Sequence, residues 1–218
     1  MDLKIFDLGL VDFSESWQFQ KEVFSRVKDN TFDSALVFCQ HNPVITLGRN
    51  SSKDNILAKE EELENKGIKL FEVERGGDVT YHGPGQLTVY PIFNLNLLKK
   101  DLNWFLRSLE EVVLGLLADF GIEAERRPGL TGVWVQGKKL ASIGIAVKNW
   151  ITYHGLTVNI KEDDLANFSL IRPCGMDIMM TSLESVLGRS IESSQIKETL
   201  KRRIQDDQGC FAGIRRGD

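Results

Sequence analysis

One short segment of the chain, Arg75 to Gln86, contains four glycines, a proline and a histidine between two predicted strands. Glycine in such a region indicates a positive φ or a backbone that another group approaches closely. A simple hairpin needs only about two residues of this kind. The segment has more glycine than a turn requires, so we predict that it lies against a ligand, between strands at 68–73 and 87–93.

The rest of the pattern predicts a mixed sheet with flanking helices. The clearest helix covers 101–120, where apolar residues recur at three- and four-residue spacing and Gly121 follows as a C-terminal cap. Grouped strands with hairpins favour an α/β (α+β) fold with a mixed sheet over a doubly wound parallel sheet. We expect one domain over 1–218. The other predicted helices cover 15–28, 58–65 and 193–205, and the other strands 35–39, 44–47, 131–136, 139–147 and 150–159.

Composition narrows the function classes. The chain has 218 residues and a net charge of −4, which argues against generic binding to nucleic acid or anionic membranes. No apolar run reaches the roughly 18 residues of a membrane span, and the N-terminus lacks the apolar core of a signal peptide. The three cysteines, at 39, 174 and 210, form neither a disulfide nor a metal-binding pattern. We expect a cytoplasmic protein without a metal site.

Cys174 is the candidate nucleophile. Pro173 restricts the backbone before it and Gly175 frees the backbone after it, which predicts a sharp turn that could present a thiol. The alternative is a small buried apolar residue, a common role of intracellular cysteine. Cys39, inside an apolar strand, is expected in the core, and Cys210 is expected to be an incidental thiol.

A reactive thiolate needs a neighbour that favours its charge. The candidates are His41, His82, His154 and the adjacent pair Lys138 and Lys139. Strand alternation points the two lysines to opposite faces, so at most one of them enters a site, and periodicity does not select which. Each histidine could instead be structural, which is the reading we favour for His41.

Four blocks of sequence resemble the octanoyltransferases of lipoate biosynthesis. They are Arg75 to Gln86 with Tyr90-Pro91, Gly132 to Val135 with Lys139 to Gly144, Trp150 to Leu156, and Pro173-Cys174-Gly175. Asn42 to Gly48 is also similar. The blocks occur in order and span most of the chain. Asp78 lies where the family varies, Ala146 occupies a position that is often basic, and Thr157 replaces a more usual alanine.

The resemblance implies a lipoate/biotin protein ligase-like fold and transfer of an octanoyl group through a cysteine thioester, without a cofactor. Cys174 matches the nucleophile and Lys139 its partner. The implied donor is octanoyl-acyl carrier protein, and the implied acceptors are lipoyl domains of 2-oxoacid dehydrogenase complexes and the glycine cleavage H protein. Substrate-contacting positions would be Arg75, Gly76, Gly77, Asp78, Val79, Thr80, Tyr81, His82, Ser142, Ile143, Gly144, Gly155, Leu156 and Thr157.

Two other functions remain open at this point. An ATP-dependent lipoate– or biotin–protein ligase would share the fold but would not need Cys174. A non-catalytic scaffold that binds a lipoyl domain or acyl carrier protein would tolerate the change Cys174→Ala. The oxyanion donor is also open, between the Gly175 N–H and groups around His82. For docking of an acidic carrier protein the candidates are Arg49, Arg126, Arg127, Lys148 and Arg172.

Overall fold

The structure is a computed structural model that describes residues 2–205, 211, 215 and 216. For Cys174, Arg215 and Arg216 it describes the backbone but not the side chain. Cys210 lies outside the described residues. Within them, no helix has both the length and the apolar character needed to cross a membrane.

The main sheet is mixed, as the sequence predicts. Within the described residues it has eight strands in the order β11-β1-β2-β6-β10-β9-β8-β7. β1 runs parallel to β2 and β11, and the other neighbouring pairs are antiparallel. The bounds are β1 (Asp2–Val11), β2 (Ser34–His41), β6 (Gln86–Phe93), β7 (Glu125–Arg127), β8 (Leu130–Val135), β9 (Lys138–Lys148), β10 (Ile151–Asn159) and β11 (Arg215–Arg216).

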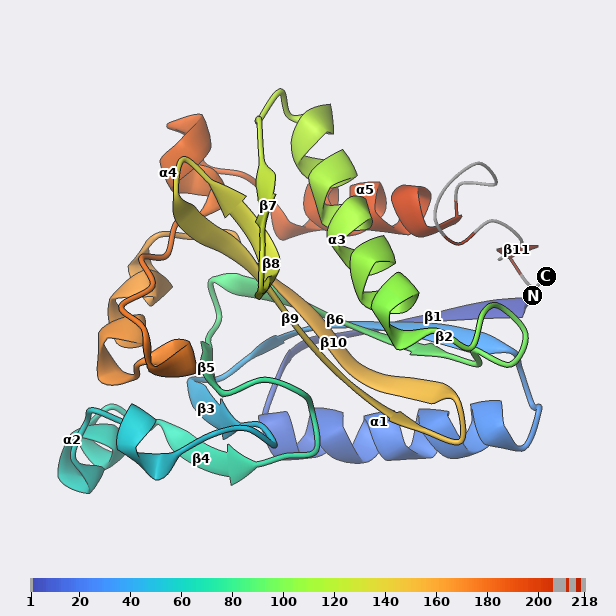
Figure 1. Ribbon diagram of the computed structural model, residues 1–218, viewed down its shortest axis with the longest axis horizontal. Coiled ribbons are helices and arrows are strands. Elements are labelled where there is room, and N and C mark those ends of the chain that lie inside the picture. The colour runs from blue at the N-terminus through green and yellow to red at the C-terminus, as the bar shows by residue number, and fades with distance from the viewer. Residues whose placement is uncertain (1, 206–210, 212–214, 217–218) are drawn as a thin grey trace.

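Helices cover both faces of this sheet (Figure 1). α1 (Phe13–Lys28) closes one core, in which Val23 and Val27 pack with residues of β2 and β6. α3 (Leu102–Asp119) and α5 (Ser193–Gln205) close the larger core on the other face. The Asp101 side chain caps α3 by accepting a hydrogen bond from the Trp104 N–H at 2.9 Å. Most of the apolar residues predicted to line one face of α3 belong to this larger core.

A second, smaller sheet corrects one prediction. Its order is β4-β3-β5, with β3 (Val44–Leu47) between β4 (Lys69–Glu72) and β5 (Val79–His82). β5 lies inside the segment expected to be a continuous glycine-rich loop, so that expectation was wrong for 79–82. Val79, Thr80 and Tyr81 favour extended backbone, and β3 supplies the partner strand. Two loops remain, 73–78 and 83–85, one on each side of β5.

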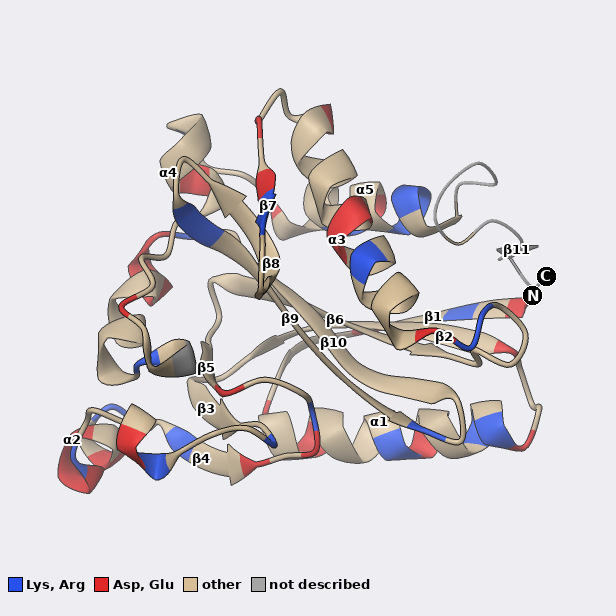
Figure 2. Ribbon diagram, in the orientation of Figure 1, with Lys and Arg blue, Asp and Glu red and all other residues tan. Residues whose placement is uncertain are grey.

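The remaining elements are short; the first two lie between β3 and β4, and the other three lie between β10 and α5. They are the 3₁₀ helix η1 (Lys53–Asn55), the helix α2 (Glu60–Asn65), the 3₁₀ helices η2 (Asp163–Leu170) and η3 (Pro173–Gly175), and the helix α4 (Leu183–Leu187). Figure 2 shows that charged residues gather on α1 and on the small elements around α2, whereas the central strands are largely uncharged. In the β9–β10 pair, lysine occurs only at the two ends of β9.

Candidate active site

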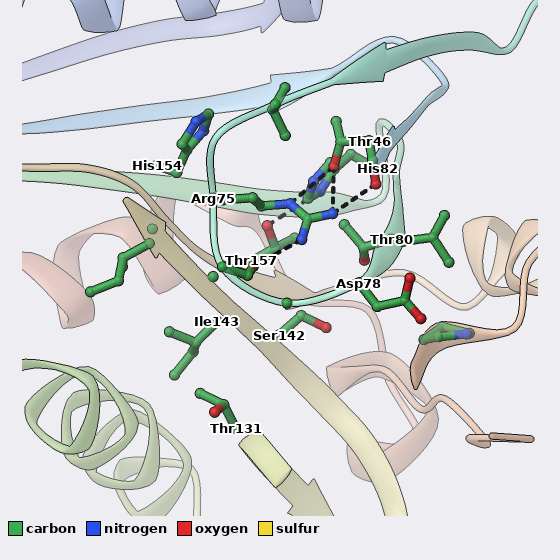
Figure 3. A pocket seen from close by; sticks show the side chains of 18 of the residues that line it. Thr46, Arg75, Asp78, Thr80, His82, Thr131, Ser142, Ile143, His154 and Thr157 are labelled. Carbon is green, nitrogen blue, oxygen red and sulfur yellow. Dashed lines mark hydrogen bonds between the residues drawn. The ribbon is translucent and has the colours of Figure 1, made fainter. Parts of the chain in front are cut away.

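A cavity of about 460 Å³ lies between the loop before β5, the middle of β9 and the start of α3 (Figure 3). β8 pairs with β9 only over Lys138–Ala141, so within the described residues the edge of β9 beyond Ala141 has no strand partner on that side, and the cavity lies there. The loop reaches this edge, and the Gly76 N–H donates to the Ile145 carbonyl at 2.8 Å. The predicted substrate-contacting residues that line the cavity are Arg75, Gly76, Gly77, Asp78, Val79, Thr80, His82, Ser142, Ile143, Gly144, Gly155 and Thr157.

Two predicted substrate-contacting residues, Tyr81 and Leu156, do not line the cavity. Tyr81 is fully buried in a separate apolar core, where its ring meets Phe168 edge-on. Leu156 is buried in the core beneath α3. Strand alternation does not explain this difference, because Val79 lies on the same face of β5 as Tyr81, Ile143 lies directly opposite Leu156 in the β9–β10 pairing, and both Val79 and Ile143 line the cavity. The sequence motif identified the right segments but did not show which of their residues are packed into the apolar cores.

Arg75 fixes the loop over the cavity. Its guanidinium donates to the Thr46 carbonyl at 2.7 Å, to the Thr46 hydroxyl at 2.9 Å and to the Gly76 carbonyl at 3.1 Å. Figure 3 shows these bonds converging between the loop and β3. Gly144 allows the loop to come this close, because a Cβ at that position would lie 3.0 Å from the Gly76 carbonyl oxygen and 3.2 Å from Arg75 Cδ.

The structure distinguishes the two adjacent lysines. Lys139 lines the cavity, whereas Lys138 is exposed and does not line it. The backbone of Lys139 also pairs with the segment that follows the cysteine turn. Its N–H donates to the Met179 carbonyl at 2.8 Å, and its carbonyl accepts from the Thr181 N–H at 3.0 Å. This short parallel pairing brings the chain after residue 174 to the start of β9.

The predicted cysteine turn forms the 3₁₀ helix η3 (Pro173–Gly175). Pro173 lines the same cavity as Lys139. The turn is anchored at Arg172, whose N–H donates to the Asn55 carbonyl at 2.8 Å, and the Asn55 amide donates to Asp78 Oδ2 at 2.6 Å. Because the Cys174 side chain lies outside the described part of the structure, its pairing with Lys139 stays a prediction.

One oxyanion candidate has another partner. The Gly175 N–H donates to the Arg172 carbonyl at 3.0 Å and so closes the turn itself. Gly175 has a φ of 63°, a conformation that suits glycine at the end of such a turn. To serve an oxyanion, this N–H would first have to leave the turn.

The three histidines are buried and hydrogen-bonded. His41 Nε2 lies 2.7 Å from the Tyr90 hydroxyl, and burial lowers the His41 pKa to about 4. Burial also lowers the pKa of His154 to about 4, although Glu74 lies 3.5 Å from its Nε2. The pKa of His82 is lowered by burial first and then by the charges of His41 and Arg75, and its Nδ1 lies 3.3 Å from the Thr157 hydroxyl. The predicted structural role of His41 fits this environment.

Cys39 is a core residue, as predicted. Its side chain is fully buried between α1 and the sheet, and burial raises the pKa of its thiol. A neutral buried thiol is a poor nucleophile. Among the described residues, the side chains that line the cavity include two cations, Arg75 and Lys139, while burial favours the neutral form of the histidines.

Solved structures with the same arrangement of strands and helices are lipoate protein ligases. Lipoate-protein ligase A bound with ATP aligns with a TM-score of 0.79 and 14% identity, over 100% of this chain and 89% of that one. A bi-partite lipoate protein ligase from Thermoplasma acidophilum aligns with a TM-score of 0.74 and 15% identity, over 100% and 87%. At such identities the likeness defines the fold, which is that of lipoate protein ligases.

Sequence comparison is more specific. The profile of the lipoyl protein ligase A/B catalytic domain matches residues 12–205. The octanoyltransferase of Caldicellulosiruptor saccharolyticus is 46% identical over 199 residues, covering 90% of this chain and 84% of that protein. The octanoyltransferase of Geobacter metallireducens is 39% identical over 203 residues, covering 93% and 92%. The chain belongs to the lipoyl protein ligase A/B catalytic domain family and, within it, to the octanoyltransferases. The family predicted from the four sequence blocks is confirmed.

Proposed function

We propose that the chain transfers an octanoyl group from octanoyl-acyl carrier protein to a lysine of a lipoyl domain, with a thioester on Cys174 as the intermediate. The observation that carries the mechanism is the shared cavity of Lys139 and Pro173. It is supported by the backbone pairing of Lys139 with the segment after the cysteine turn. The similarity to octanoyltransferases supports the acyl group and the reaction class.

The lysine supplies the charge that a thiolate needs. An ammonium about 4 Å from a thiolate contributes up to roughly 4 kcal/mol at an effective dielectric constant near 20. Such a contribution lowers the pKa of a cysteine by up to about three units from its ordinary value near 8.5. Cys174 would then be ionised at neutral pH without the help of a histidine. This assignment agrees with the low pKa values of His41 and His154, which stay neutral.

The proton steps balance with Lys139 as the carrier. The Cys174 thiolate attacks the donor thioester, and the carbon–sulfur bond to the carrier breaks as the Lys139 ammonium protonates the departing thiolate. The neutral Lys139 amine then takes a proton from the incoming lysine ammonium. That amine attacks the Cys174 thioester, the amide forms, and Cys174 leaves as a thiolate. The second proton of the attacking amine passes to water, so the whole reaction releases one proton.

The apolar part of the cavity lining suits an alkyl chain. Leu102 and Leu106 from α3, Leu130 from β8 and Ile143 from β9 lie along it. Burial of seven carbons beyond the carbonyl, at about 0.8 kcal/mol each, would contribute roughly 5–6 kcal/mol to binding. A donor thioester is already activated, so the reaction needs no nucleotide and no other cofactor.

The proposed acceptors are lipoyl domains of 2-oxoacid dehydrogenase complexes and the glycine cleavage H protein. The proposal also treats residues 1–218 as one catalytic domain that works in the cytoplasm, where its thiol stays reduced. Most of the basic residues expected to dock an acidic carrier are paired within the chain. Three of the five candidates already form ion pairs, namely Arg126 with Glu110 at 3.0 Å, Arg127 with Glu125 at 3.6 Å and Arg172 with Asp177 at 3.1 Å.

Intact-mass spectrometry with octanoyl-acyl carrier protein, in the absence of ATP, tests the proposal. We expect an octanoyl adduct that maps to Cys174, is cleaved by hydroxylamine and is discharged by an apo lipoyl domain. An ATP-dependent ligase would form no such adduct, and a scaffold would keep its binding in the variant Cys174→Ala. Absence of the adduct under these conditions overturns the proposal.

The variant Lys139→Ala tests whether Lys139 keeps Cys174 ionised. We expect slower alkylation of Cys174 at neutral pH and a higher apparent pKa of the thiol, because the neighbouring positive charge is gone. Lys138→Ala is the matched control, since Lys138 is the adjacent lysine and does not line the cavity. An unchanged pH profile in Lys139→Ala would remove Lys139 from the mechanism.

A further inference from the structure

The Lys139 ammonium lies over the ring of a buried tryptophan. Trp134 on β8 is directly opposite Lys139 in the β8–β9 pairing, and Lys139 Nζ lies 5.0 Å from the ring centroid. This distance is within the range of a cation–π interaction. Arg127 also lies over the ring, with its Cζ 6.0 Å from the centroid. The ring therefore contacts two cations.

The surroundings of Trp134 differ from those of its neighbours on β8. Val133 and Val135 belong to the large core under α3, whereas Trp134 belongs to none of the apolar clusters among the described residues. Yet Trp134 is only 1% exposed. A large aromatic side chain that is buried against cations rather than in an apolar core indicates a role beyond filling volume.

Gly132 leaves room for the lysine side chain. A Cβ at this position would lie 2.5 Å from the Ala141 carbonyl oxygen, 2.7 Å from Lys139 Cε and 3.3 Å from Lys139 Nζ, and the Gly132 φ of 132° also favours glycine. The Gly132 backbone is itself fixed, because its N–H donates to Glu110 Oε1 at 3.1 Å. Glu110 is fully buried on α3, and its other carboxylate oxygen accepts from Arg107 at 2.6 Å and Arg126 at 3.0 Å. The Lys139 side chain thus packs against Gly132, whose backbone is fixed by the hydrogen bond to Glu110.

We propose that Trp134 and Gly132 are positioning residues that hold the Lys139 ammonium at the cysteine turn, an inference that rests on the proposed function. A lysine side chain has four rotatable bonds, so without a partner its charge would be spread over many positions. A carboxylate partner would hold it but would also cancel its field at the thiol. An aromatic ring attracts the ammonium and carries no net charge, so this contact does not itself cancel the field of the ammonium at a thiolate.

Substitution of the tryptophan tests this inference. In Trp134→Leu we expect the apparent pKa of Cys174 to rise and its alkylation near neutral pH to slow about three- to tenfold, as loss of a cation–π contact implies. Trp134→Phe keeps a ring with a weaker attraction and should recover part of the loss. We expect kcat to fall while KM for the acyl carrier protein stays unchanged. Trp104→Phe is the matched control, because Lys99 Nζ lies 6.0 Å from that ring and Trp104 does not line the cavity.

A second measurement avoids any change of shape. In a chain where the other three tryptophans (Trp17, Trp104 and Trp150) are replaced by phenylalanine, Trp134 can be labelled with tryptophans of increasing fluorine content. Fluorine withdraws charge from the ring face, so we expect alkylation to slow in step with fluorination. Equal pH profiles across this series overturn the inference. If Lys139→Ala raises the pKa of Cys174 in the same assay, the proposed function survives that failure.

Discussion

The change Gly144→Ala tests the contact between the loop and β9 on which the cavity depends. The added methyl would lie 3.0 Å from the Gly76 carbonyl oxygen and 3.2 Å from Arg75 Cδ, whereas ordinary contact begins at 3.4 Å. We expect the loop to move by about 0.4 Å, because β9 is paired with β10 along most of its length, whereas the loop is held by fewer bonds, such as those of Arg75 to Thr46. The Gly76 N–H bond to the Ile145 carbonyl would lengthen or break.

The size of the effect follows from this displacement. A misplacement of 1 Å in a catalytic site can cost about a hundredfold in rate, so 0.4 Å corresponds to a loss of about five- to tenfold in kcat/KM. The extra methyl is also an overpacking change, for which about 1 kcal/mol of stability is a typical cost. For a chain of this length, that cost lowers Tm by about 2–4 °C. Activity should therefore fall further than such a small loss of stability explains.

The assay measures octanoyl transfer from octanoyl-acyl carrier protein to an apo lipoyl domain, together with thermal unfolding. Gly115→Ala is the control, because Gly115 lies on α3 and its added methyl would meet only the flexible end of Arg203. Alanine in a helix gains about 0.5–1 kcal/mol over glycine, so this variant should keep its activity and its Tm should not fall. Wild-type kcat/KM in Gly144→Ala would show that the loop does not press on β9, and the reasoning would be wrong.

Two further predictions concern chain length and pH. In Leu106→Trp the larger side chain fills part of the cavity, so the preference for octanoyl over hexanoyl donors should fall about fifteenfold, the value of two methylenes at roughly 0.8 kcal/mol each. Equal losses with both donors would place the alkyl chain elsewhere. His41 and His154 have pKa values lowered from 6.5 to about 4. Between pH 6.5 and about 4 the unfolded chain therefore binds protons at these histidines that the folded chain does not bind. The folded state should lose this part of its stability as the pH falls from 6.5 toward 4. Urea unfolding should show about 2 kcal/mol less stability per histidine near pH 5 than near pH 7, and equal free energies would contradict the assignment.

Much of the fold could be predicted because its signals are local. The helix predicted over 101–120 is α3 (Leu102–Asp119), since its apolar spacing and its end residues point to the same boundaries. The strand predicted over 44–47 has those bounds in the structure. β1 was missed, because its partner β2 lies about thirty residues away and its charged residues weaken the alternation. β5 was missed because glycine on both sides masks a four-residue strand that only β3 stabilises.

In the candidate site, too, local sequence signals were predictable and contacts between distant segments were not. The sequence blocks identified the segments around the cavity, but only the packing of the fold shows that Tyr81 and Leu156 are buried in apolar cores instead of lining the cavity. The choice between Lys138 and Lys139 required the irregular pairing of β8 with β9, where one residue of β9 has no opposite partner. The contact of Trp134 with Lys139 also depends on that register, which no periodicity encodes.

The loop that covers the cavity also shields a bare strand. Past Ala141, β9 would present unpaired backbone groups to solvent, and the Gly76–Ile145 bond covers part of that row. A variant that loosens this loop would expose a flat, apolar edge to other molecules. One substitution would then lower both solubility in cells and turnover. A low yield of soluble protein from a loop variant would therefore indicate that the loop no longer covers the cavity.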